Sequence, residues 1–255
     1  MVEEKKREGD CNPPIVFRNV AMSFNGLQVH RDISFQICES EIVTILGPSG
    51  TGKTVLLKLM MGLLFPTGGD IEVFGVHLSS CTEKDLQTIR SKIGMLFQGA
   101  ALFDSLSVYE NIAYPLRERG GFSEKEIREV VKRNLSLVDL PGIEGKYPPE
   151  LSGGMKKRVG LARALAVSPK IVLFDEPTTG LDPTSVRLID DLILKLKEEL
   201  DITCVLVTHD IESSKRVSDR WILVHNGCVL ADGPVRHLLE HNSHVKNFVE
   251  GRWNT

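Results

Sequence analysis

Hydrophobic residues fall along the chain in short runs that predict two kinds of element. Runs of aliphatic and β-branched side chains at 42–46, 171–174 and 203–207 are bounded by polar or turn-forming residues, which is typical of buried strands. Longer stretches typical of helices follow the last two runs, at 185–200 and 211–217. This alternation of strands and helices predicts an α/β fold that contains parallel strands.

The segment before residue 40 has a different pattern. Between residues 15 and 37, apolar and polar residues alternate in short bursts, and Asn25-Gly26 is a strong signal for a hairpin turn. The run at 71–74, which ends at Gly75, continues this pattern. We therefore expect an antiparallel β-layer, most of it before the strand at 42–46.

Residues from about 98 to 165 interrupt the α/β pattern. A helical stretch at 107–117 comes first, and a capping box that starts at Ser123 opens another helix, which runs to about Val138. A helix at 159–166 closes the segment. The sequence therefore predicts an inserted α-helical subdomain within one larger domain.

The two ends of the chain are set apart from this domain. Residues 1–14 are expected to form a flexible leader, because the charged N-terminus has no apolar core behind it and is not a signal peptide. The domain itself is expected to span 15–240, and 241–255 to form a short C-terminal tail. No window of the sequence approaches the roughly 18 uninterrupted apolar residues that a membrane span needs.

Composition narrows the class of protein only slightly. The chain has 255 residues, of which 42% are hydrophobic and 25% charged, as in ordinary globular proteins. The net charge of −3 gives no reason to expect nucleic acid as a partner. The five cysteines are scattered without C-x-x-C spacing, so they indicate neither a zinc site nor a disulfide framework. We expect a cytoplasmic protein in a reducing compartment.

The strongest chemical signal lies between the strand at 42–46 and the helix that follows it. The segment fits the phosphate-loop pattern G-x-x-x-x-G-K-[ST], in the strand–loop–helix context that the pattern requires. Glycines let the backbone curl until its N–H groups surround an anion, and the helix N-terminus adds positive potential. The eight residues are Gly47, Pro48, Ser49, Gly50, Thr51, Gly52, Lys53 and Thr54.

Two carboxylates end the strand at 171–174. Asp175 and Glu176 follow four apolar residues, and the carboxyl ends of parallel strands are where α/β folds place nucleotide sites. We expect Lys53 to bind the β- and γ-phosphates of ATP, and Thr54 and Asp175 to hold Mg²⁺. Glu176 is the candidate general base that polarises the attacking water.

A second anion-binding arrangement lies at Ser152, Gly153 and Gly154, just before the basic run 156–158. Alone, such a segment is more often a linker or a helix N-cap. One γ-phosphate does not need two cradles from one chain. We therefore expect a head-to-tail dimer with two ATP sites at the seam, each capped by the serine of the other copy.

Taken together in order, these motifs resemble those of ATP-binding-cassette (ABC) transporter ATPases over about residues 15–240. The resemblance implies a P-loop NTPase (RecA-like) core with an antiparallel β-subdomain and an inserted α-helical subdomain. It also implies a signature motif at 151–155, a D-loop at 180–182, and roles for Gln98, His209 and Phe24. Gln98 would contact Mg²⁺ or the water, and His209 the γ-phosphate; a lone histidine is more often structural. Phe24 would stack on adenine, with a place in the core as the alternative.

The residues within and between the motifs indicate a particular group of ABC transporter ATPases. The segments at 50–58, 97–111 and 151–158 resemble the ATPases of Mla/Mce-type lipid transporters. This implies a cytoplasmic ATPase on the inner face of the inner membrane, driving phospholipid or a similar hydrophobic substrate through an integral-membrane permease, with an Mce-type lipid-binding subunit as a further possible partner. One alternative is the ATPase of an importer of amino acids or other small polar solutes. Another is a soluble, non-transport ABC ATPase; these usually carry tandem cassettes or a long coiled-coil insertion, neither of which this chain has.

A permease contact is predicted directly after Gln98. Ala100, Ala101, Leu102 and Phe103 are four apolar residues beside a loop, outside the catalytic strands. Such residues either pack inward or form an exposed docking patch. The resemblance favours docking, in a groove that includes residues 107–114.

Overall fold

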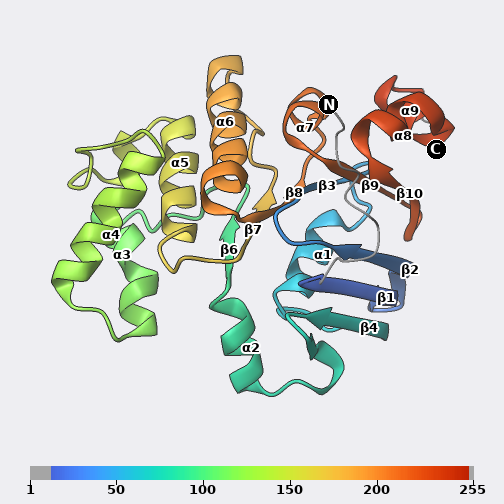
Figure 1. The fold of residues 1–255 in the computed structure, drawn as a ribbon, viewed down its shortest axis with the longest axis horizontal. Coiled ribbons are helices and arrows are strands. Elements are labelled where there is room, and N and C mark those ends of the chain that lie inside the picture. Colours follow the sequence, from blue (N-terminus) through green and yellow to red (C-terminus); the bar gives the residue numbers. More distant parts are fainter. Residues whose placement is uncertain (1–12, 253–255) are drawn as a thin grey trace, which may run out of the picture.

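Residues 13–252 are described by a computed structural model, in which one ten-stranded mixed sheet is flanked by helices (Figure 1). The strands are β1 (Ile15–Phe24), β2 (Leu27–Ile37), β3 (Ile42–Leu46), β4 (Gly68–Val73), β5 (Val76–His77), β6 (Ile93–Leu96), β7 (Ile171–Asp175), β8 (Thr203–Val207), β9 (Arg220–His225) and β10 (Cys228–Pro234). The helices are α1 (Lys53–Met60), α2 (Glu83–Arg90), α3 (Val108–Arg119), α4 (Glu124–Leu137), α5 (Gly153–Ala164), α6 (Pro183–Leu200), α7 (Ile211–Val217), α8 (Val235–His241) and α9 (Ser243–Val249).

The sheet joins a parallel part to an antiparallel part. Its strand order is β5-β4-β1-β2-β10-β9-β3-β8-β7-β6, with β3, β8, β7 and β6 all parallel. Strands β1, β2, β4 and β5 pair antiparallel. The predicted α/β fold with an antiparallel β-layer is therefore confirmed.

The parallel strands are buried on both faces, which explains their continuous apolar runs. Val172 and Phe174 of β7 pack on one face against helices α3 to α6, while Ile171 and Leu173 pack on the other. On that second face, α1 shares its core with the antiparallel strands, since Leu56 and Phe17 belong to one cluster. Helix α1, which carries the phosphate loop at its start, is thus enclosed between the two parts of the sheet (Figure 1).

Turn and cap residues act where the sequence places them. Asn25 and Gly26 both have left-handed φ angles, of 48° and 83°, as a two-residue hairpin turn requires. Ser123 caps α4 with the predicted capping box, because its hydroxyl accepts from the N–H of Glu126 and the Glu126 carboxylate accepts from the Ser123 N–H.

Helix α5 begins earlier than predicted. It starts at Gly153, directly after Ser152, rather than at residue 159. The Ser152 hydroxyl accepts from the N–H of Met155 at 3.3 Å and so caps the helix. Two glycines and a run of cations hide the helical pattern, but glycines in a capped first turn are tolerated.

The C-terminal part is more ordered than the predicted tail. Residues 243–249 form α9, and Asn242 caps it by accepting from the N–H of Val245. Val245 is buried in a cluster with Trp221 and Leu223 of β9. Residues 1–12, which include most of the predicted leader, lie outside the described part of the chain, so that prediction remains untested.

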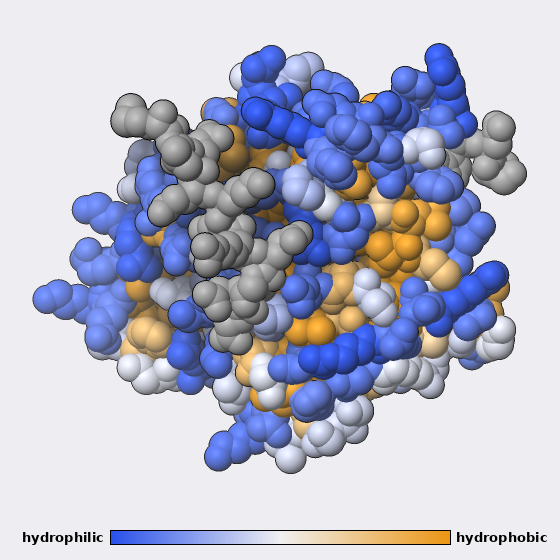
Figure 2. Space-filling view, turned by 45° about the vertical axis from the view of Figure 1, so that its right-hand side comes forward, coloured by the Kyte–Doolittle hydropathy of each residue, from blue (hydrophilic) through white to orange (hydrophobic). Residues whose placement is uncertain are grey.

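Three further observations concern the surface, the lengths of the helices and the thiols. The face in Figure 2 is mainly hydrophilic, with hydrophobic areas between the polar ones. Within residues 13–252, no helix has the length and apolar character needed to cross a membrane. Within the described residues, Cys81, Cys204 and Cys228 are free thiols.

Candidate functional site

The phosphate loop connects β3 to α1 and depends on close backbone packing. Gly52, the residue before α1, has a left-handed φ of 81°. A Cβ atom at Gly52 would lie 2.4 Å from Cγ1 of Val29 and 2.8 Å from Cε1 of His30. The His30 ring is fully buried, and its Nε2 lies 3.2 Å from the Gly52 carbonyl oxygen. The antiparallel layer therefore packs against the phosphate loop through Val29 and His30 of β2, and the sequence predicted no role for this histidine.

Lys53 is folded back over its own loop. Its Nζ donates to the carbonyl oxygens of Gly47 at 2.8 Å and Pro48 at 2.9 Å, and the residue is only 8% exposed. Burial lowers the pKa of Lys53, and the nearby carboxylates of Glu176 and Asp175 oppose this effect. The loop thus holds a desolvated cation near its centre, where a phosphate oxygen would meet it.

Thr54 and Asp175, predicted as magnesium ligands, are in direct contact. The Thr54 hydroxyl donates to Oδ1 of Asp175 at 2.9 Å, and burial raises the pKa of the Asp175 carboxyl. Hydroxyl and carboxylate oxygens suit Mg²⁺, which is usually held by one or two protein ligands together with water and phosphates. Among residues 13–252, no group of three or more His, Cys, Asp or Glu side chains is placed to hold a metal ion.

Glu176 lies in a strained and heavily bonded position. Its φ is 50°, a left-handed value that is uncommon for a residue with a side chain, and its N–H donates to Val207 at 2.8 Å. The carboxylate accepts from Thr179 Oγ1 at 2.9 Å and Thr208 Oγ1 at 3.4 Å. His209 Nδ1 lies 2.9 Å from the same carboxylate oxygen, Oε2. Two of the three residues predicted to be catalytic, Glu176 and His209, are therefore adjacent, and two threonines that the motifs did not reveal hold the carboxylate.

A cavity of about 550 Å³ brings most of the predicted site together. Gln98 and His209 line it from the ends of β6 and β8, and Phe24, which is 38% exposed, lines it from β1. The exposure of Phe24 argues against the alternative of a core residue. The full lining is Phe24, Val29, Ser49, Gly50, Gly52, Lys53, Thr54, Val55, Gln98, Glu176, Val207 and His209.

The serine–glycine segment is not part of this cavity. Ser152 and Gly153 are exposed at the start of α5, and neither they nor Gly154 lines the cavity. A Cβ atom at Gly154 would lie 2.9 Å from the Ser185 hydroxyl, so the glycine allows α5 to approach the start of α6. Within one chain, the two predicted anion cradles are therefore separate.

The loop after Gln98 is held from α5 by one side chain. Ala100 and Ala101 both have left-handed φ angles, of 60° and 50°. Arg163 donates to their carbonyl oxygens at 2.9 Å and 2.8 Å, respectively. Burial lowers the pKa of the Arg163 guanidinium. The segment beyond Gln98 is therefore fixed to the helical block.

A surface groove of about 790 Å³ follows this loop. Phe97, Phe103 and Tyr114 line it and are 38%, 46% and 43% exposed, and the rings of Phe103 and Tyr114 lie 5.2 Å apart. Ala100 is buried and Leu102 packs partly against the core. Of the four residues predicted as a docking patch, only Ala101 and Phe103 line the groove.

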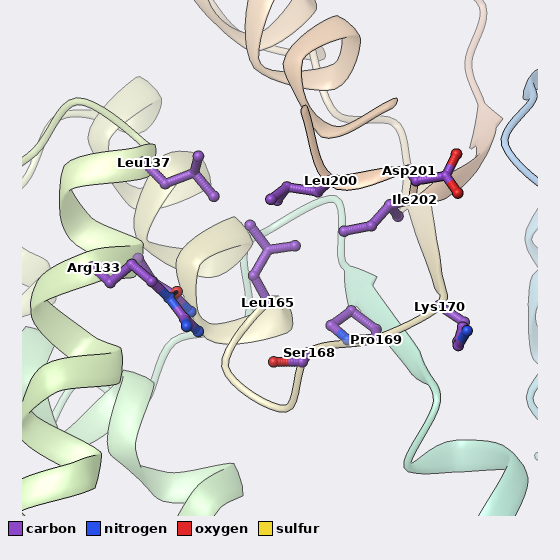
Figure 3. A pocket seen from close by; sticks show the side chains of 10 residues that line it. Arg133, Leu137, Leu165, Ser168, Pro169, Lys170, Leu200, Asp201 and Ile202 are labelled. Carbon is purple, nitrogen blue, oxygen red and sulfur yellow. Dashed lines mark hydrogen bonds between the residues drawn. The ribbon is translucent and has the colours of Figure 1, made fainter. Parts of the chain in front are cut away.

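Another cavity, of about 540 Å³, lies where β7 and β8 begin (Figure 3). Its apolar lining includes Leu137, Leu165, Leu200 and Ile202, which belong to or follow helices α4, α5 and α6. None of the predicted site residues lines it. It is therefore separate from the nucleotide cavity, at the opposite ends of the same strands.

Comparisons with known proteins extend over most of the chain. Residues 30–179 match the family model described as ABC transporter. The probable ribonucleotide transport ATP-binding protein mkl of Mycobacterium leprae is 41% identical over 239 residues, which cover 93% of this chain and 69% of that protein. The intermembrane phospholipid transport system ATP-binding protein MlaF of Haemophilus influenzae is 37% identical over 238 residues, which cover 93% and 90%.

A solved structure gives the corresponding similarity in three dimensions. The ATP-binding cassette MJ0796, as a dimer in a post-hydrolysis state bound to ADP and Pi, matches with a TM-score of 0.80 and 33% identity. The match covers 87% of this chain and 99% of that one. The similarity in three dimensions therefore extends over most of this chain and nearly all of that one.

Proposed function

This chain belongs to the ABC transporter family as an ATP-binding, ATP-hydrolysing subunit, and on that premise we propose that it drives phospholipid, or a similar hydrophobic substrate, through a membrane permease. The observation that carries the hydrolytic part is the single cavity shared by Lys53, Gln98, Glu176 and His209. The proposal that the substrate is a phospholipid is supported by the 37% identity to MlaF and by the resemblance of the segments 50–58, 97–111 and 151–158 to lipid-transporter ATPases.

Binding of ATP begins with an exchange at Lys53. The ammonium group leaves the carbonyl oxygens of Gly47 and Pro48 and donates to the β- and γ-phosphates, while the loop N–H groups surround them. Thr54 and Asp175 would hold Mg²⁺, which neutralises phosphate charge when bound. Gln98 lines the same cavity and is placed to contact the ion or the water. The exposed Phe24 ring offers its face to the adenine.

Hydrolysis depends on Glu176. Its carboxylate, held by Thr179 and Thr208, orients the water that attacks the γ-phosphate and accepts a proton from it. His209 now contacts this carboxylate and is largely exposed, so it is free to turn toward the γ-phosphate when ATP is present. Glu176 then acts on the attacking water, and His209 acts on the γ-phosphate that the water attacks.

The working form is a head-to-tail dimer of this chain. Ser152 is exposed at the N-terminus of α5, away from the chain's own nucleotide cavity. A second copy brings this serine and the helix N-terminus to the γ-phosphate. ATP closes this dimer and hydrolysis reopens it.

The permease docks in the groove lined by Phe97, Phe103 and Tyr114, on the cytoplasmic side of the inner membrane. An apolar helix face fits this groove. The strained loop between Gln98 and the groove is fixed by Arg163, so a change at Gln98 is passed to the docked helix. An Mce-type lipid-binding subunit on the far side of the membrane would complete such a transporter.

Polar solutes are the competing class of substrate. The 41% identity to mkl, whose name states ribonucleotide transport, favours this second candidate. Purification of the chain with its native permease, followed by extraction and mass spectrometry, separates the two. Copurified phospholipid, and ATP hydrolysis stimulated by phospholipid, support the proposal; stimulation by a polar solute alone contradicts it.

A further inference from the structure

A buried lysine on α5 reaches the catalytic glutamate from outside the known motifs. Lys157 is only 6% exposed, and its Nζ donates to the main-chain carbonyl oxygen of Glu176 at 2.9 Å. Burial lowers the pKa of Lys157, while the charges of Glu176 and Asp175 oppose the effect. A lysine withdrawn from water in this way is costly, so its contact with the site needs an explanation.

The peptide groups on either side of Glu176 are both held. The Glu176 N–H donates to Val207 of β8, and the Glu176 carbonyl accepts from Lys157 of α5. The N–H of Thr179 approaches the same carbonyl only at 3.4 Å. Since Glu176 has a strained φ of 50°, its backbone keeps this conformation only where its surroundings fix it.

We propose that Lys157 is a positioning residue, which fixes the main chain of Glu176 and so sets the direction of the carboxylate toward the attacking water. The inference rests on the proposed role of Glu176 in hydrolysis. Lys157 touches neither the nucleotide cavity nor the carboxylate in this structure, and it acts only through the Glu176 peptide. Catalytic rates respond steeply to such displacement of a reacting group.

Helix α5 also connects this contact to the second nucleotide site of the proposed dimer. Ser152 at its first turn faces the partner's nucleotide in the proposed dimer, and Lys157 lies five residues later on the same helix. One rigid helix therefore links the γ-phosphate of one site to the glutamate of the other. Tilting of α5 as the dimer closes moves the Glu176 carbonyl with it.

The test compares Lys157→Met with a matched change on the same helix. Arg158 also donates to main-chain carbonyls, of Val138 and Asp139 at 3.2 Å and 3.1 Å, but these lie in the helical block. For Lys157→Met we expect kcat about 10- to 100-fold lower, with KM for ATP within about threefold of wild type. For Arg158→Met we expect kcat within about twofold of wild type, even if its melting temperature falls.

Two further variants separate positioning from structural damage. Lys157→Arg keeps a charged donor and is expected to restore most of the kcat lost in Lys157→Met. Lys157→Leu, which also lacks a donor, replaces Lys157→Met if the latter does not fold, and the same split between kcat and KM applies. If Lys157→Met, or the variant that replaces it, matches Arg158→Met in kcat or raises KM without lowering kcat, the inference is overturned.

Glu176→Gln, assayed alongside, keeps the two proposals distinct. If Glu176→Gln hydrolyses ATP near the wild-type rate, the proposed role of Glu176 fails and the inference fails with it. If Glu176→Gln is inactive and Lys157→Met is fully active, only the inference about Lys157 fails.

Discussion

The two ends of the parallel strands carry cavities of nearly equal volume and different lining residues. Strand β7 begins beside the 540 Å³ cavity and ends, at Asp175, beside the 550 Å³ cavity. At its end, a cation, a carboxylate, an amide and an imidazole converge on one space. At its start, four aliphatic side chains share the lining with Arg133 and Lys170.

This difference follows from the direction of the strands rather than from the size of the cavities. Loops that leave the carboxyl ends of parallel strands lead into helix N-termini, whose N–H groups and dipoles attract phosphate. Loops at the other ends come from helix C-termini and have no such attraction. Volume therefore does not identify the reacting end, whereas strand polarity does, and changes at the two ends should have unequal effects.

The largest effect is expected for Glu176→Gln. The amide cannot accept a proton from water, so kcat should fall by about 100- to 10,000-fold while ATP still binds through Lys53. The variant should then accumulate as an ATP-bound dimer, detected by size-exclusion chromatography with light scattering. Turnover near that of wild type would remove Glu176 from its role.

Lys53→Ala should act on binding rather than on chemistry alone. Loss of a charge-assisted contact to the phosphates is worth roughly 1.5–3 kcal/mol, or about a 10- to 150-fold weaker affinity for ATP. Isothermal titration calorimetry with ATP measures this directly. An unchanged affinity would show that the loop N–H groups suffice without the lysine.

Mixed dimers test whether the nucleotide end is completed by a second copy. Lys53→Ala and Ser152→Arg chains should each be inactive alone, because each disrupts both composite sites. A mixed dimer should contain one intact site, so up to about half of the wild-type activity should return if the sites act independently. Tagged copies purified in tandem show that mixed dimers form; no activity in such dimers would contradict composite sites, or would require both sites to fire together.

Phe103→Ser should leave the nucleotide end intact. Phe103 is 46% exposed in the groove, so the variant should fold and bind ATP as wild type does but lose copurification with the permease and permease-stimulated ATPase. Leu102→Ser is the matched control, because Leu102 packs against the core and its loss should lower the melting temperature instead. Full coupling in Phe103→Ser would place the docking site elsewhere.

The smallest effect is expected at the opposite cavity. Leu200 is 45% exposed there, so Leu200→Ser should change the free energy of unfolding by about 1 kcal/mol or less and leave kcat and KM unchanged. Thermal denaturation and steady-state ATPase assays measure both. A marked loss of turnover would mean that the two ends of the strands are coupled.

The elements that could be predicted from sequence were those whose residue pattern is set by a single factor, such as burial on both faces of the sheet. Strands at 42–46 and 203–207 are buried on both faces, so all positions except Thr44 and Thr203 are apolar and the limits of the strands are clear. The predicted start of α5, at residue 159, was wrong. The Ser152 cap begins the helix at Gly153, although two glycines and three consecutive cations in its first turns do not resemble a helical pattern. Helix α9 was missed because its apolar face is short and becomes visible only against Trp221.

The same distinction applies to the site. Thr54 and Asp175 meet as their motifs require, since Asp175 ends β7 and Thr54 lies in the helix that follows the loop after β3, another parallel strand of the same sheet. His30, Thr208 and Lys157 were not foreseen, because their roles arise from contacts between segments far apart in the sequence. A basic run such as 156–158 is usually a solvated surface, and only the fold shows that its middle lysine is buried.

The resting state of Lys53 has a consequence for the thermodynamics of ligand selection. Because its ammonium group already donates to two loop carbonyls, an incoming nucleotide replaces existing bonds rather than filling an empty donor. The binding enthalpy is then a difference between two sets of bonds and should be smaller than a count of new contacts suggests. Ligands whose phosphates do not reach the ammonium leave the internal bonds in place, so we expect the loop to favour ATP over a nucleoside monophosphate, which lacks both the β- and the γ-phosphate.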